Sequence, residues 1–151
     1  MTLPIIGRRF RNAALLYGLI LFAWIRIEDF QTLPVVIFGT TLAGFLLVGW
    51  LLNRFGGKTL PSRFLLLAAV LAGAVLGLSA VIATTLLMFF KTASHAHIFP
   101  DYPPLQMLAM LERAPAWTAA GALLGLAAAL LGLALRKPSN TETPTSTEEP
   151  A

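Results

Sequence analysis

One uncharged run of 27 residues, from Phe64 to Phe90, constrains the fold of this chain more than any other feature. A helix needs about 20 predominantly apolar residues to cross the hydrocarbon core of a bilayer, because each residue advances it by about 1.5 Å. Two further uncharged runs, at 34–52 and 115–135, meet the same requirement. The sequence therefore predicts membrane-spanning helices over 34–52, 64–90 and 115–135.

The composition indicates the same class of protein. Charged residues make up 12% of the 151 residues, about half of the roughly 25% found in soluble globular domains. A soluble fold needs more charge than this to cover its surface, so lipid is the expected solvent for most of the chain. The chain has no cysteine, which excludes disulfides, thiolate metal sites and cysteine nucleophiles.

The first apolar segment, at 12–28, is shorter than the others. Only 14 uncharged residues lie between Arg11 and Arg26. A basic start before a short apolar core is also typical of a cleaved signal peptide, and the Arg8–Arg9 pair resembles part of a twin-arginine signal. No small-x-small cleavage site precedes the acidic "IEDF", and snorkelling of Arg11 and Arg26 lengthens the usable span. We therefore expect 12–28 to be an uncleaved first span.

The basic residues predict the orientation of these four spans. With the N-terminus in the cytoplasm, eight of the eleven Lys and Arg residues fall on the cytoplasmic side, and only Arg26, Lys91 and Arg113 fall on the other. Cytoplasmic connections carry the excess of Lys and Arg in membrane proteins. The expected architecture is an all-α integral membrane protein with four transmembrane helices and both termini inside. Its alanine-rich helices and short loops suggest a multi-pass protein of a bacterial inner membrane.

Two regions follow from this pattern: a transmembrane domain at 1–137 and a tail at 138–151. The tail has no Lys or Arg and no apolar periodicity, so we expect a disordered cytoplasmic segment. The net charge of +4 comes from short basic clusters beside apolar runs. Because these clusters form no contiguous basic patch, a nucleic-acid partner is not expected.

Small residues spaced four apart suggest how the helices pack. Helices associate in a bilayer through close packing, which small side chains permit. A chain rich in Gly and Ala also produces such spacings by chance, and a contact within the chain or with a partner subunit fits them equally. The two clearest stripes are Ala69, Gly73 and Gly77 in one helix, and Gly121, Gly125 and Ala129 in another; weaker pairs are Ala14 with Gly18 and Gly39 with Ala43.

The 91–114 connection holds the candidate metal ligands His95, His97 and Asp101. In an extended segment His95 and His97 point to the same face, whereas in a helix they diverge by about 200°. A zinc or copper site needs about three or four ligands, so the histidine pair alone is incomplete. The alternative is an interfacial loop in which the histidines and Tyr102 lie at the level of the lipid headgroups.

A short amphipathic helix is expected after Pro103 and Pro104, in the sequence "LQMLAMLER". Its apolar residues fall on one broad side, with Gln106 and Arg113 opposite. We expect it to lie in the plane of the outer leaflet and to offer a docking surface. The apolar side comprises Leu105, Met107, Leu108, Met110 and Leu111.

The sequence contains no set of catalytic residues with a recognisable spacing. No Gly-rich phosphate loop, HExxH or GxSxG occurs. Apart from Arg26 and Glu28 at the outer end of the first span, the polar groups that the spans offer near their middles or ends are hydroxyls, which can bond back to their own helix. We therefore expect a non-enzymatic protein without a cofactor. Its expected role is an accessory, assembly or scaffold subunit that binds a membrane protein or another copy of itself. The alternative is metal or cation binding or transport at the outer face through His95, His97 and Asp101.

Overall fold

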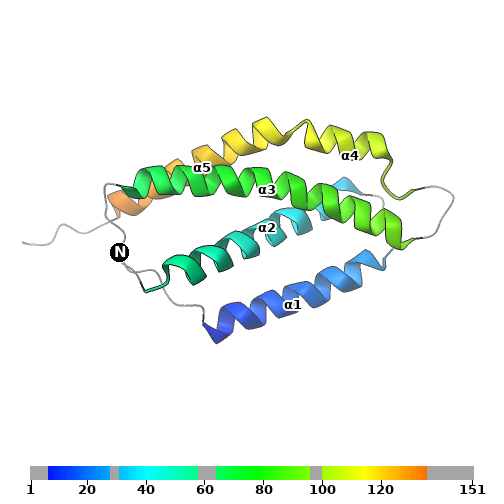
Figure 1. The fold of residues 1–151 in the computed structure, drawn as a ribbon, viewed down its shortest axis with the longest axis horizontal. Coiled ribbons are helices and arrows are strands. Elements are labelled where there is room, and N and C mark those ends of the chain that lie inside the picture. Colours follow the sequence, from blue (N-terminus) through cyan, green and yellow to red (C-terminus); the bar gives the residue numbers. More distant parts are fainter. Residues whose placement is uncertain (1–6, 28–30, 58–63, 96–99, 136–151) are drawn as a thin grey trace, which may run out of the picture.

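The computed structural model describes residues 7–27, 31–57, 64–95 and 100–135, and within these ranges the chain is helical without a strand. The helices are α1 (Arg8–Ile25), α2 (Thr32–Phe55), α3 (Leu65–Ser94), α4 (Pro104–Leu111) and α5 (Ala114–Ala134). The first three run alternately in opposite directions along one long axis, and α4 and α5 both run back along α3 (Figure 1). Residues 138–151, the predicted tail, lie outside the described residues, as does His97.

Three of these helices, α2, α3 and α5, are long and apolar enough to cross a membrane. The apolar segments predicted at 34–52, 64–90 and 115–135 are therefore confirmed as helices that are long and apolar enough to cross a membrane. At about 1.5 Å per residue, the 30 residues of α3 span about 45 Å. Because the hydrocarbon core is only about 30 Å thick, one end of α3 extends beyond it. The protein thus has the apolar helices of a multi-pass membrane protein.

Helix α1 differs from the other three long helices. It begins at Arg8, four residues before the predicted start, and ends at Ile25. The earlier start is reasonable because arginine is a good helix former. Arg8, Arg9 and Arg11 are exposed in its first turn, so its uncharged part is shorter than the about 20 residues of a typical span. The crossing predicted at 12–28 therefore stays a prediction.

Aromatic side chains join α1 to α2 along most of their length. The ring centroids of Phe10 and Phe45 are 5.7 Å apart, and those of Trp24 and Phe38 are 4.7 Å apart. Between these two contacts, the hydroxyl of Tyr17 donates a hydrogen bond to the carbonyl oxygen of Phe38 at 2.5 Å. Because these side chains are large, they hold α1 beside α2 without close backbone contact.

Helices α3 and α5 cross through their small residues. A Cβ built on Gly73 would meet the carbonyl group of Gly121, whose carbon would lie 2.9 Å away, and the Cα of Gly125 at 3.1 Å. A Cβ built on Gly77 would meet the carbonyl group of Trp117, with its carbon at 2.7 Å. The structure therefore brings the two small-residue stripes together within one chain. Ala69 contacts Gly125 in the same crossing, and Ala129 is buried in α5.

Helix α2 packs on another side of α3 through one of the weaker pairs. A Cβ on Gly39 would lie 2.6 Å from the Cα of Thr84, and Ala43 is buried against Ala80 and Ala83. The other weaker pair is not used in this way, since a Cβ on Gly18 would meet nothing within 4 Å. Helix α3 is therefore the central helix, in contact with both α2 and α5.

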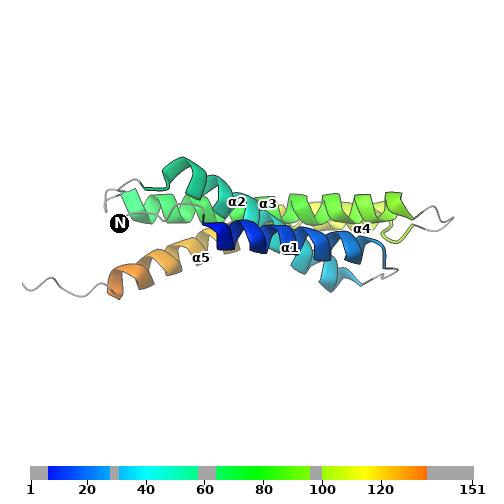
Figure 2. The ribbon, with the colours of Figure 1, turned by 90° about the horizontal axis from the view of Figure 1, so that it is seen from below.

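Helix α4 lies beside the C-terminal part of α3 and runs on toward α5, with the direction of the chain roughly preserved (Figures 1 and 2). Its inward side consists of Gln106, Met107 and Met110, and Met110 is buried in the main hydrophobic cluster. The leucines of the predicted apolar side are exposed instead. The predicted apolar side is therefore divided, because the methionines pack on the bundle and the leucines face away from it. The in-plane position on a membrane stays a prediction.

Candidate functional site at the polar end of the bundle

Polar side chains gather where α3 ends and the segment before α4 begins, which we call the polar end. The start of α2 and the end of α1 lie at the same end of the bundle (Figure 1). Three of these side chains, those of Lys91, Asp101 and Tyr102, belong to buried residues. The polar end comprises Gln31, Thr32, Lys91, Thr92, His95, Asp101, Tyr102 and Gln106.

His95 and Asp101 form the closest polar contact of the polar end. His95 follows the last residue of α3 in an extended conformation (φ −107°, ψ 108°), which turns the chain out of the helix. Its ring Nδ1 lies 2.6 Å from Oδ2 of Asp101, and the two side chains are 13% and 0% exposed. A hydrogen bond to a carboxylate is among the stronger kinds in proteins. This contact ties the end of α3 to the segment that leads into α4.

Tyr102 continues the connection toward α2. Its backbone N–H donates to Oγ1 of Thr92 at 3.1 Å, and its hydroxyl donates to the carbonyl oxygen of Gln31 at 3.0 Å. One turn later, Nε2 of Gln106 donates to Oγ1 of Thr32 at 2.8 Å. The polar side chains of this segment therefore fasten α4 to both α3 and the start of α2.

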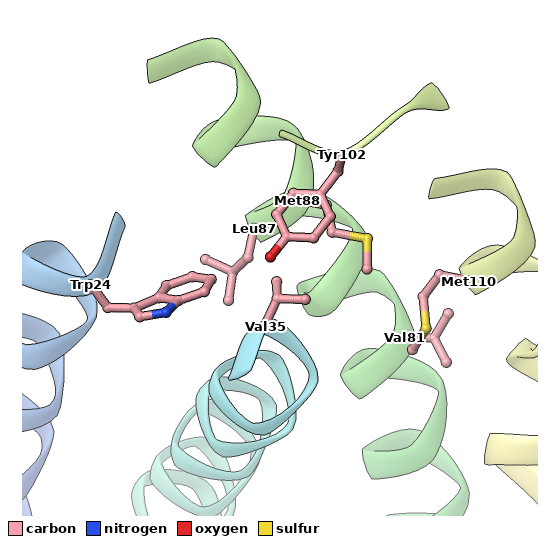
Figure 3. Close-up of a cluster of buried hydrophobic side chains, with 7 residues drawn as sticks. All are labelled: Trp24, Val35, Val81, Leu87, Met88, Tyr102 and Met110. Atoms are coloured by element: carbon pink, nitrogen blue, oxygen red, sulfur yellow. The ribbon is translucent and has the colours of Figure 1, made fainter. Parts of the chain in front are cut away.

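Tyr102 was predicted to lie at headgroup level, and this membrane depth stays a prediction; within the protein its side chain is fully buried. Figure 3 shows the ring beside Leu87 and Met88, with the hydroxyl directed toward Val35. A tyrosine is stable in such a position when its apolar ring packs in the core and its hydroxyl has a hydrogen-bond acceptor. Here the carbonyl oxygen of Gln31 is that acceptor.

Lys91 is a buried residue of the polar end that sequence reasoning did not identify as part of a site. Its side chain is fully buried, and its Nζ lies 4.0 Å from the ring centroid of Trp24 in α1. A cation over an indole ring is stabilised by about 2 kcal/mol or more when the pair is desolvated. The signal was present in the spacing, since Thr84, Leu87 and Lys91 continue one buried face at helical intervals.

The candidate metal ligands are only partly brought together. Of His95, His97 and Asp101, the first and last are in contact, and His97 lies outside the described residues. Across the described ranges, no group of three or more His, Cys, Asp or Glu side chains is placed to hold a metal ion. Since zinc sites use about three or four protein ligands, the described residues provide an incomplete set.

Comparison with known proteins does not identify this chain with any of them. No protein-family model matches it, and neither a curated protein nor a solved structure gives a match. The function is therefore inferred from the chemistry and geometry of the residues alone.

Proposed function

We propose that the protein is a non-enzymatic multi-pass membrane protein that acts by binding another membrane protein, as an accessory, assembly or scaffold subunit. The observation that supports this role is the outward side of α4. Leu105, Leu108 and Leu111 are 77%, 52% and 43% exposed, and their spacing of three places them on one side of the helix. We call these three residues the α4 leucine stripe.

The α4 leucine stripe is held in place by the inward side of the same helix. Met110 is buried in the main cluster, and Gln106 donates to Thr32. Arg113 N–H also bonds to the carbonyl oxygen of Met110, so α4 leads into α5 through one short turn. A surface that is already ordered loses little entropy on binding, which suits a docking element.

The polar end supports binding rather than catalysis. Its hydrogen bonds connect α3 to Asp101 and Tyr102, and they connect α4 to α2. Their partners are helix ends and connecting backbone, so these side chains have a structural task. Two apolar pockets along the described helices are lined by side chains that do not titrate, which gives acid–base chemistry no group in them.

The proposed topology has four crossings, both termini in the cytoplasm and the polar end on the opposite side. The arginines at the start of α1 and Arg54 near the end of α2 lie at the opposite end of the bundle from His95 (Figure 1). Basic residues mark the cytoplasmic side. On this basis we place the protein in a bacterial inner membrane, with α4 near the outer surface.

Photo-crosslinking tests the proposed docking surface. A photoreactive residue at Leu108 is expected to give one discrete protein adduct in native membranes, because the α4 leucine stripe faces a partner. The same residue at Leu124, which is also highly exposed but lies in α5, serves as the control and is expected to give lipid adducts. Lipid adducts alone at Leu108, or equal protein adducts at both positions, would contradict the proposal.

The second candidate function is metal or cation binding, and the contact between His95 and Asp101 favours it. A carboxylate bonded to one ring nitrogen of a histidine is the arrangement that orients metal-ligating histidines in many zinc sites. In such a site Nε2 of His95 would be the ligand atom, and His97 would supply a further ligand. Under this hypothesis the polar end depends on zinc or copper, and a chelator weakens the folded protein.

A further inference from the structure

A long apolar groove separates α2 from α3 over the half of α2 that leads to its C-terminus. It encloses about 770 Å³, within the range of about 300–1,000 Å³ typical of ligand sites. The two helices touch at Gly39 and Thr84 and then diverge, so that the end of α2 bows away from α3 (Figure 2). The walls of the groove include Leu46, Trp50, Phe55, Leu71, Val75 and Ile82.

The inside of this groove selects an apolar occupant. Among its lining residues only Ser79 carries a side-chain hydroxyl, and that hydroxyl donates to the carbonyl oxygen of Val75 at 2.5 Å. A ligand that carried a charged or polar group into the groove would lose its hydration without gaining a partner. The occupant is therefore apolar along the length that lies between the helices.

One exposed basic residue, Arg54, lies beside the groove at the C-terminal end of α2. Arg54 lies four residues after Trp50 and seven after Leu47, so it falls on the side of α2 that lines the groove. The side chain of Arg54 is exposed, one turn beyond the tryptophan.

From this juxtaposition we infer that the groove binds an anionic phospholipid, with its acyl chains between α2 and α3 and its phosphate group at Arg54. An exposed arginine beside an apolar groove complements an anionic phospholipid, because the arginine binds the phosphate group while the groove accommodates the acyl chains.

This site is separate from the proposed protein partner. The groove is formed by α2 and α3, whereas the α4 leucine stripe lies on the outward side of α4. Loss of lipid binding would leave photo-crosslinking at Leu108 unchanged. Loss of the protein partner would likewise leave lipid binding in the groove unchanged. The two proposals can therefore fail independently.

Trp50 in the groove wall makes the site directly observable. A Trp24→Phe/Trp117→Phe variant retains Trp50 as its one tryptophan, and bromine atoms on lipid chains quench tryptophan fluorescence on contact. In phosphatidylcholine vesicles, brominated phosphatidylglycerol is expected to quench Trp50 more strongly than brominated phosphatidylcholine at the same mole fraction. Equal quenching by the two lipids, or none by either, would overturn the inference.

Arg54→Gln is expected to reduce the preference for the anionic lipid about fivefold, which corresponds to one basic residue near an anionic surface. The matched control is Arg9→Gln, because Arg9 is also exposed but lies in α1, which contributes nothing to the groove wall. An equal loss in both variants would indicate general surface attraction and contradict a site.

Native mass spectrometry of the protein with its three tryptophans intact gives a second readout in case the double variant does not fold. After addition of equal amounts of phosphatidylglycerol and phosphatidylcholine, the complex with phosphatidylglycerol is expected to dominate, and Arg54→Gln is expected to remove that dominance. Equal populations of the two complexes in the unsubstituted protein would contradict the inference.

Discussion

Gly77→Val is expected to destabilise the protein strongly, because it separates α3 from α5. A Cβ at this position would meet the carbonyl group of Trp117 and would lie 3.1 Å from the Cα of Thr118. These are backbone atoms, which cannot move aside as a flexible side chain can. Overpacking typically costs about 1–3 kcal/mol, and we expect a loss at or above the upper end of that range. Gly121→Val, which faces Gly73 from the other helix, is expected to behave in the same way.

Thermal unfolding in mild detergent provides the measurement. The matched control is Gly132→Val, since Gly132 lies in α5 and a Cβ there would meet nothing within 4 Å. It makes the same chemical change in the last turn of α5 without a packing clash. A fall in melting temperature for Gly77→Val and Gly121→Val, but not for Gly132→Val, is expected. Equal melting temperatures in all three variants would contradict the crossing of α3 and α5.

Asp101→Ala is expected to have the second large effect, because it releases the segment before α4. The substitution removes the acceptor of His95, whose ring nitrogen lies 2.6 Å from the Asp101 carboxylate. Loss of a partner from a largely buried polar group costs about 1–3 kcal/mol. Asp101→Asn retains an oxygen acceptor of similar shape, so we expect a smaller loss for it.

The control for Asp101→Ala is Glu112→Ala, which removes an exposed carboxylate from the turn after α4. Surface substitutions of this kind usually change stability by no more than about 0.5 kcal/mol. Melting temperatures of the purified variants, measured with and without a chelator, also separate the two hypotheses for the polar end. A structural contact predicts no effect of the chelator on the unsubstituted protein. A metal site predicts that the chelator lowers its melting temperature and has little effect on Asp101→Ala.

The apolar helices could be predicted from the sequence because their signal is local and strong. Twenty or more uncharged residues in a row have few alternatives to a helix that crosses a bilayer. The Gly73 and Gly121 stripes could also be recognised by spacing, since close helix packing needs small residues at intervals of four. Which helix each stripe contacts depends on the tertiary arrangement, which the spacing alone does not contain.

The polar end could not be assembled from the sequence because its residues belong to separate segments. Lys91 was counted as an outer basic residue, but its long side chain packs inward against Trp24, far away in the sequence. Tyr102 was assigned to the interface by its residue type, which does not reveal that its ring is buried and that its hydroxyl reaches Gln31 across 71 positions. Both residues are amphipathic, and composition does not decide whether the apolar part or the polar tip of such a side chain determines its position.

The α4 leucine stripe shows a related limit of pattern analysis. The sequence pattern placed the leucines and methionines on one apolar side, which suits a helix with one apolar environment. In the structure Met107 and Met110 face the bundle, whereas Leu105, Leu108 and Leu111 are exposed. A helix between a protein core and lipid has two apolar environments, so its inward side cannot be read from hydrophobicity alone.

The most direct test of the central claim, a four-span protein with its polar end outside, is a series of topology reporters. Reporters fused after Asp29, Gly57, Ala96 and the C-terminus are expected to lie outside, inside, outside and inside, in that order. The Asp29 fusion examines α1, whose arginines shorten its uncharged part. A reporter after Asp29 on the same side as the N-terminus would show that α1 does not cross, and an inside reporter after Ala96 would reverse the placement of the polar end.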